Sequence, residues 1–160
     1  MITLEIPNDE WRAPARTALG IGRDPADCGG DDNQQCLRDM IDTYKSNVDA
    51  IFKELTAIAD PSKTLIRAQD FYMYLFPADQ ISQIYDIFPS YWKEAQDYLG
   101  EVAAGYGIPV AKVYDDFMGP DGTKNPEQDG LISSDGLHPT VAGAQRISEL
   151  IHDLGYGLAS

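Results

Sequence analysis

Basic residues are scarce in this sequence. Lys and Arg number 12 against 26 Asp and Glu, so the formal net charge is −14. Binding to the phosphates of a nucleic acid or to an anionic membrane surface needs clusters of Lys and Arg, so this composition argues against both. It suits a protein that stays in solution and takes neutral or cationic ligands.

Long apolar runs and an apolar leader are also missing. No stretch approaches the ~20 apolar residues of a membrane span, and the first residues have neither the basic start nor the apolar core of a signal peptide. Hydrophobic residues nevertheless make up 43% of the 160 residues and aromatic ones 10%, which argues against disorder. We therefore expect one soluble domain over residues 1–160, with no integral membrane segment.

Cysteine is nearly absent, since Cys28 and Cys36 are the two in the chain. Without a third and a fourth ligand nearby they make a poor zinc site. The sequence also lacks a phosphate-binding loop and an H-E-x-x-H motif, so we expect neither a metal nor a cofactor. The two cysteines flank a short, turn-rich loop, which leaves two alternatives open. They form a disulfide, which favours an extracellular location, or they are two free thiols.

Apolar periodicity predicts alternating strands and helices. The clearest helix covers 36–59, where apolar residues recur at steps of three and four. The predicted order is a strand over 2–6, the helix 36–59, a strand over 64–68, a helix from Ser90 to Tyr106, a strand over 109–114 and a helix from Thr140 to Gly155. Such alternation predicts an α/β fold with a parallel sheet and right-handed crossovers, here with about three strands.

Ligands of open α/β sheets collect beyond the carboxyl ends of the strands. Three segments end there: 7–9, 69–72 and the loop 115–138. The last contains Asp135 and His138, one of two histidines in the chain. A carboxylate three residues before a histidine can accept its Nδ1 proton and leave Nε2 as a base. The other interpretation is an aspartate that caps a turn beside a surface histidine.

Three sequence blocks resemble SGNH/GDSL hydrolases. SSDGLHPTVAGAQRISELI is similar to the last block of that family, D-x-x-H-P at the start of the final helix. TLIRAQDFY resembles its fourth strand and the following turn, and ITLEIPND resembles its third-strand block, G-x-N-D. The resemblance implies a flavodoxin-like, three-layer α/β/α sandwich and hydrolysis of carboxylic esters, as in esterases and lipases. It also implies that His138 is the base, Asp135 its orienting carboxylate and Asn8 an oxyanion-hole donor.

The chain departs from this family at the nucleophile. The G-D-S block and the second block are missing, and Ile6 or Pro7 stands where G-x-N-D has its glycine. Three explanations remain open: an N-terminally truncated chain, a small enzyme that rebuilds the site, or a fold that lost catalysis and serves as a binding or assembly module. Ser133 and Ser134 are the serines nearest the Asp135–His138 pair in sequence, so they are the first nucleophile candidates to test.

The missing strands also predict a partner. Without its usual neighbour, the strand 2–6 becomes an apolar edge, which is a template for association. A two-fold dimer satisfies the same edge on both copies. We expect a homodimer through 2–6, acting on a small-molecule or lipid ester.

Overall fold

The computed structural model describes residues 2–4, 28–60, 62–72 and 87–157. Within these ranges the chain is mixed α/β, with three strands and four helices. In chain order they are β1 (Ile2–Leu4), α2 (Gln35–Ile58), β2 (Ile66–Gln69), α3 (Phe88–Gly105), β3 (Val110–Ala111), α4 (Val113–Met118) and α5 (Val141–Asp153). No helix in this part of the chain is long and apolar enough to cross a membrane.

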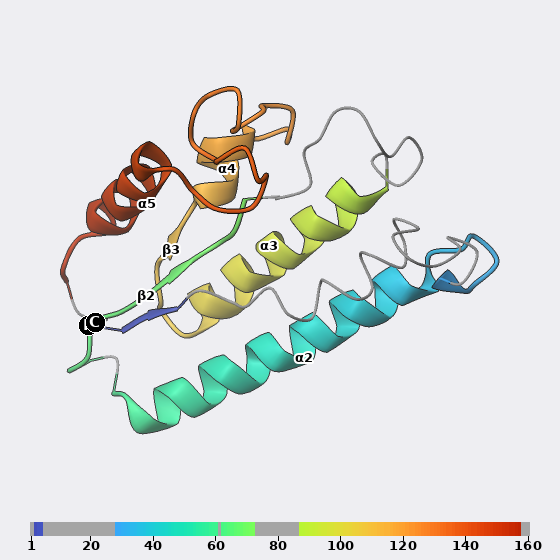
Figure 1. Cartoon of the computed structure of the whole chain (residues 1–160). Helices are drawn as coiled ribbons and strands as arrows, with labels where there is room; N and C mark the ends of the chain where they lie inside the picture. The colour runs from blue at the N-terminus through green and yellow to red at the C-terminus, as the bar shows by residue number, and fades with distance from the viewer. Residues whose placement is uncertain (1, 5–27, 61, 73–86, 158–160) are drawn as a thin grey trace.

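The strands form one parallel sheet in the order β1-β2-β3. Ile2 lies opposite Ile66, and Ala68 lies opposite Val110. Figure 1 shows α2 and α3 on one side of the strands and α4 and α5 on the other. All four residues of β2 are buried, as is usual for a parallel strand that is covered on both faces. The predicted parallel α/β arrangement is therefore confirmed.

The apolar stripes of α2 and α3 pack against each other and form most of the core. α2 buries Leu37, Met40, Ile41, Tyr44, Val48 and Phe52, and α3 buries Phe88, Trp92, Ala95, Leu99 and Ala103. Ile58, which the periodicity places inward, is instead 81% exposed. The Tyr106 ring, just past the end of α3, stacks on Phe52 at 6.0 Å. Because α3 ends beside Phe52, the last turn of α2 extends past it and Ile58 stays uncovered.

Three predicted elements have wrong boundaries. α3 begins at Phe88 rather than at Ser90, and the Ser90 hydroxyl donates to the Ile87 carbonyl over 2.7 Å. Pro89 allows this start because the first turn of a helix needs no backbone N–H from it. The predicted strand 109–114 contains only the two-residue β3, since α4 begins at Val113. The strand predicted over 64–68 lies at 66–69.

The last helix begins as predicted, and its inward face differs from the prediction. Thr140 caps α5, because its side chain accepts a hydrogen bond from the Gly143 backbone N–H. Val141, expected inward, is 88% exposed, and Ala144 is exposed too. Gly143 is the buried residue of α5. Successive residues of a helix point about 100° apart around its axis. Val141 precedes Gly143 by two residues, so its side chain points about 200° away from the buried face and toward solvent.

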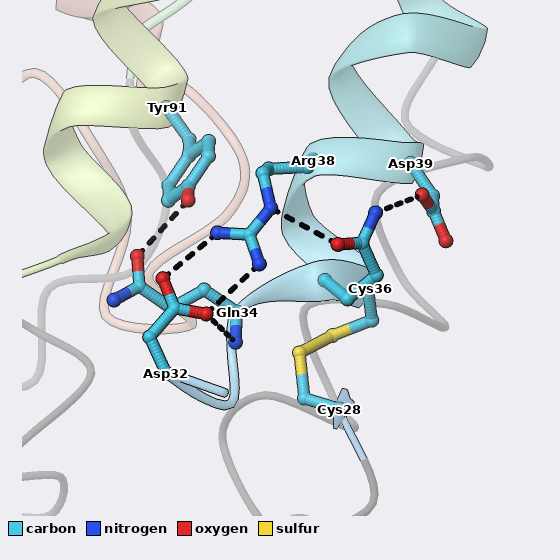
Figure 2. The surroundings of a disulfide bond; sticks show 8 residues. Cys28, Asp32, Gln34, Cys36, Arg38, Asp39 and Tyr91 are labelled. Atoms are coloured by element: carbon cyan, nitrogen blue, oxygen red, sulfur yellow. Dashed lines mark hydrogen bonds and ion pairs between the residues drawn. A yellow bond between two sulfur atoms is a disulfide. The ribbon is translucent and has the colours of Figure 1, made fainter. Parts of the chain in front are cut away.

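A disulfide joins Cys28 to Cys36 at the start of α2. Figure 2 shows the bond beside the first turn of the helix. Of the two alternatives that the sequence leaves open, the structure has the bonded one. The two cysteines are eight positions apart in the sequence. The bond therefore ties the beginning of α2 to the chain directly before it.

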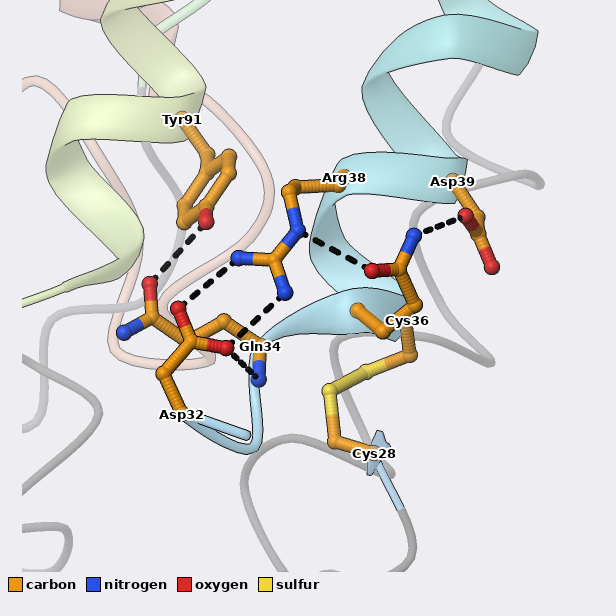
Figure 3. A network of polar contacts seen from close by, with 8 residues as sticks. Cys28, Asp32, Gln34, Cys36, Arg38, Asp39 and Tyr91 are labelled. Atoms are coloured by element: carbon orange, nitrogen blue, oxygen red, sulfur yellow. Dashed lines mark hydrogen bonds and ion pairs between the residues drawn. A yellow bond between two sulfur atoms is a disulfide. The ribbon is translucent and has the colours of Figure 1, made fainter. Parts of the chain in front are cut away.

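A polar network surrounds this bond, as Figure 3 shows. Arg38 donates two hydrogen bonds to Asp32, at 2.8 and 2.9 Å, and this guanidinium lowers the pKa of Asp32 to about 2. The Tyr91 hydroxyl donates to the Gln34 side chain over 2.9 Å. Because Tyr91 belongs to α3, this contact links the two core helices at the disulfide end.

Candidate active site

Asp135 and His138 lie in direct contact in the loop before α5. The Oδ2 atom of Asp135 is 2.7 Å from the Nδ1 atom of His138, so the predicted hydrogen bond is confirmed. An ionised carboxylate only accepts hydrogen bonds, so Nδ1 must carry the proton. In the neutral imidazole, Nε2 is then the free base.

The second oxygen of Asp135 organises the backbone of the same loop. Oδ1 accepts hydrogen bonds from the Ser133 hydroxyl at 2.5 Å and from the backbone N–H groups of Leu137 and His138, both at 2.9 Å. These donors hold the pKa of Asp135 well below its ordinary value, the His138 N–H most strongly and the Ser133 hydroxyl next. Asp135 therefore stays ionised at neutral pH and can accept the imidazole proton.

The loop closes on itself around this carboxylate. The Ser133 N–H donates to the His138 carbonyl over 2.8 Å, and Ile132 forms a bridge with Pro139. Gly136 has a φ of +69°, a left-handed conformation that glycine adopts without strain. The D-G pair at 135–136 thus permits the tight turn that returns the chain from Asp135 to His138.

The loop is also fixed to the start of α5. The Thr140 hydroxyl donates to the Gly130 carbonyl over 2.6 Å and accepts from the Gly143 N–H over 3.1 Å. At Gly143 the helix backbone lies directly on the Leu131 carbonyl, and a Cβ there would overlap that oxygen. The lack of a side chain at Gly143 therefore lets the loop pack closely, at Leu131, against the first turn of α5.

The pair lies on an open surface. The His138 side chain is 71% exposed and that of Asp135 is 50% exposed. Val141, on the first turn of α5, offers an exposed apolar side chain three residues after His138. An open histidine of this kind can meet a bulky substrate, but it does not exclude water from the reaction.

The structure brings together three of the five predicted site residues: Ser133, Asp135 and His138. The Ser133 hydroxyl bonds to the carboxylate. Among the described residues, neither Ser133 nor Ser134 has a hydrogen bond to the imidazole, so either serine would need to reorient to reach Nε2. Asn8 lies outside the described residues. The nucleophile and the oxyanion-hole donor therefore stay predictions.

Sequence reasoning gave no role to the residues that follow β2. The Tyr72 hydroxyl donates to the Leu137 carbonyl over 2.8 Å, across 65 residues of chain. The sequence places the segment 69–72 at the carboxyl edge of the sheet. A polar ring directly after a buried strand was the available signal, but nothing in its spacing points to Leu137.

Asp70 is a buried acid at the same edge. Its side chain is 2% exposed, its Oδ1 accepts from the Tyr114 N–H at 2.7 Å, and Lys112 Nζ lies 3.5 Å from Oδ2. Burial raises the pKa of Asp70 above its ordinary value, against the opposing effects of these two donors. Asp70 thus joins the end of β2 to α4, and the described contacts do not bring it to the imidazole.

A polar groove of about 390 Å³ lies along α2 and α3. Four of its five charged side chains form two ion pairs: Lys45 with Glu94 and Lys93 with Asp97, each at 2.7 Å. None of the predicted site residues that the structure describes lines it. The groove therefore adds nothing to the Asp135–His138 pair. In the described part of the chain, no cluster of three or more His, Cys, Asp or Glu side chains is placed to hold a metal ion.

Comparison with known proteins gave no match. No family model, no curated protein and no solved structure is similar enough to the chain to place it in a family. The assignment of a function therefore depends on the loop geometry and on the sequence blocks.

Proposed function

We propose that this protein is a hydrolase of carboxylic esters, similar to the SGNH/GDSL esterases and lipases. One observation supports this most directly: the 2.7 Å contact between Asp135 Oδ2 and His138 Nδ1, within D-x-x-H-P at the start of the last helix. A structural turn needs the aspartate as a cap, but it does not need an ionised carboxylate on the ring nitrogen of a histidine. That contact is what a histidine base requires.

In the proposed reaction, His138 Nε2 takes the proton of an attacking hydroxyl, from a serine or from water. The hydroxyl oxygen bonds to the ester carbonyl carbon, and the carbonyl oxygen becomes an oxyanion, for which Asn8 is the proposed donor. The imidazolium, stabilised by Asp135, returns its proton to the departing alkoxide. With water as nucleophile the acid is formed directly. With Ser133 or Ser134 as nucleophile, a water then releases the acid from the acyl-enzyme in a second, equivalent step.

We propose that the chain has the fold of a flavodoxin-like α/β/α sandwich. Parallel strands in the order β1-β2-β3, with helices on both sides, support it. The candidate base then lies beyond the carboxyl edge of the sheet, where ligands of such folds bind.

The proposed substrates are neutral small-molecule or lipid esters. A net charge of −14 repels anionic esters and leaves neutral ones unaffected. The exposed Val141 beside the loop gives an apolar acyl or alcohol group a surface to contact.

The decisive experiment measures hydrolysis of p-nitrophenyl butyrate by the purified chain. His138→Ala should lose at least about 100-fold in kcat/KM, the range of a general base. His152→Ala is the matched control, because His152 is the other histidine and is also exposed, on α5. Equal rates for wild type and His138→Ala would refute the proposal. A wild type without turnover on esters of several chain lengths would favour the alternative, a binding or assembly module without catalysis.

We also propose that the chain forms a homodimer through residues 2–6. β1 pairs with β2 on one side, and among the described strands it stands at the edge of the sheet. An edge strand of apolar sequence pairs readily with a second copy of itself.

A further inference from the structure

Besides the burial of Ile132 in the core, one long-range hydrogen bond between a described side chain and the backbone holds the loop that carries His138. Its other hydrogen bonds, described above, stay within the segment 126–143. Between described residues, the Tyr72 hydroxyl is the side-chain donor from outside that segment, bonding to the Leu137 carbonyl at 2.8 Å. Leu137 directly precedes His138, so this bond acts one residue from the candidate base.

Tyr72 is well placed to act as an anchor because its own position is fixed. The residue is 2% exposed. Its ring stacks on Phe117 of α4, with centroids 5.1 Å apart and planes 13° apart, and on Phe71 at 4.8 Å. A tyrosine held between two rings can direct its hydroxyl with little loss of entropy.

The backbone that bears Tyr72 is held from α3. Gln96 Oε1 accepts from the Phe71 N–H at 2.8 Å, and Trp92 Nε1 donates to the Phe71 carbonyl at 3.0 Å. Gln96 is 5% exposed and Trp92 is 2% exposed. Both backbone groups of Phe71 are therefore bonded to buried side chains, which fixes the backbone directly before Tyr72.

We infer that Tyr72 is a positioning residue for His138, an inference that rests on the proposed ester hydrolysis. The local bonds of the loop set the shape of the Asp135–His138 turn. The Tyr72 bond sets where that turn stands relative to the sheet. Without it, the Leu137–His138 peptide, whose N–H donates to Asp135, is held from one side alone. The turn then shifts at the carboxyl edge, and the imidazole loses alignment with both Asp135 and the substrate. Misplacement of a catalytic group by about 1 Å can reduce the rate by about 100-fold.

Tyr72→Phe tests the inference, because it removes the hydroxyl and keeps both ring stacks. Tyr91→Phe is the matched control, since it removes a tyrosine hydroxyl bond at the disulfide end of the core. For Tyr72→Phe we expect kcat to fall about tenfold or more while KM changes less than about twofold. Tyr91→Phe should leave both constants as in the wild type.

A second readout does not depend on activity. Nitrogen NMR of the histidine rings at about pH 8.5, where imidazoles are ordinarily neutral, reports which ring nitrogen carries the proton. The wild type should show His138 as the Nδ1–H form alone, and Tyr72→Phe should show a mixture with the Nε2–H form. His152→Ala identifies the His138 signals. If Tyr72→Phe does not fold, Phe117→Leu is the second variant. It removes the ring stacked on Tyr72 and keeps the Tyr72 hydroxyl, and it should give the same mixture of Nδ1–H and Nε2–H forms of His138.

The two proposals fail in different ways. An inactive wild type refutes ester hydrolysis, and the NMR comparison still decides whether Tyr72 positions the imidazole. An active wild type whose kcat and His138 tautomer are both unchanged in folded Tyr72→Phe refutes the positioning role and leaves the hydrolase proposal intact.

Discussion

The Tyr114 backbone N–H donates to the Oδ1 atom of Asp70 over 2.7 Å, which joins the end of β2 to the first turn of α4. The first N–H groups of a helix have no partner within the helix, so a carboxylate there stabilises its start. This bond accounts for the early end of β3. The residues from Pro109 to Tyr114 resemble a strand in sequence. The helix α4 nevertheless begins at Val113, where Asp70 can accept a hydrogen bond from the backbone of its first turn.

Asp70→Asn should make the protein less sensitive to pH. Burial raises the folded pKa of Asp70 above the unfolded value near 3.9. The contribution of Asp70 to stability is therefore fully present below about pH 4 and is lost as the pH rises through the folded pKa. Each unit of raised pKa corresponds to about 1.4 kcal/mol. In urea unfolding, the stability of Asp70→Asn relative to wild type should increase from about pH 4 to pH 7. Asp42→Asn, an exposed Asp→Asn change on α2, is the matched control.

Asp135→Asn should reduce ester hydrolysis by up to about 10⁴-fold, the loss typical of a triad whose orienting aspartate is replaced by asparagine. An amide cannot stabilise the imidazolium, and its NH₂ group would face Nδ1 as a donor. Asp129→Asn serves as the control, because Asp129 is an exposed aspartate of the same loop. Comparable steady-state rates for both variants would contradict the role of Asp135.

Loss of the Cys28–Cys36 disulfide should lower the free energy of unfolding by about 2.5 kcal/mol. Chain entropy predicts this size for a bond that closes eight residues. Cys28→Ala/Cys36→Ala and the wild type in reductant should give the same reduced stability in chemical denaturation. Reductant should have no further effect on the double variant, and a wild type indifferent to reductant would show that the bond contributes nothing.

Gly143→Ala should destabilise the fold by about 1–3 kcal/mol, because the new Cβ meets the Leu131 carbonyl and overpacking costs this much. The change also displaces the loop of His138 from α5, so ester hydrolysis should fall with it. Gly105→Ala at the end of α3 is the control, since nothing lies within 4 Å of a Cβ there. Its melting temperature should equal or exceed that of the wild type. A Gly143→Ala protein as stable as this control would contradict the close approach.

Light scattering at micromolar concentration should give a mass of twice 17.6 kDa for the proposed dimer. Leu4→Lys should shift the protein to the monomer, because a charge on an edge strand opposes pairing. Ala50→Lys adds the same charge on the exposed surface of α2 and should leave the mass unchanged. A wild-type monomer, or a dimer that persists in Leu4→Lys, would rule out association through β1.

The sequence alone determined the order and type of the main elements. The apolar repeat from Leu37 to Leu55 and the strand before Asp70 are local patterns, and burial of one helix face or of a whole strand follows directly from them. The Asp135–His138 contact was predictable for the same reason. A three-residue spacing with glycine at 136 lets the two side chains meet within one short turn.

Tertiary structure decided what depends on contacts between distant segments. Periodicity places Val141 and Ile58 inward, but their exposure depends on where Leu131 meets Gly143 and where α3 ends. The bond from Tyr72 to Leu137 crosses 65 residues, and the Asp70 bond to Tyr114 crosses 44. Such pairs depend on how the sheet packs against both helical layers. No local sequence pattern indicates which residue will meet a partner so far along the chain.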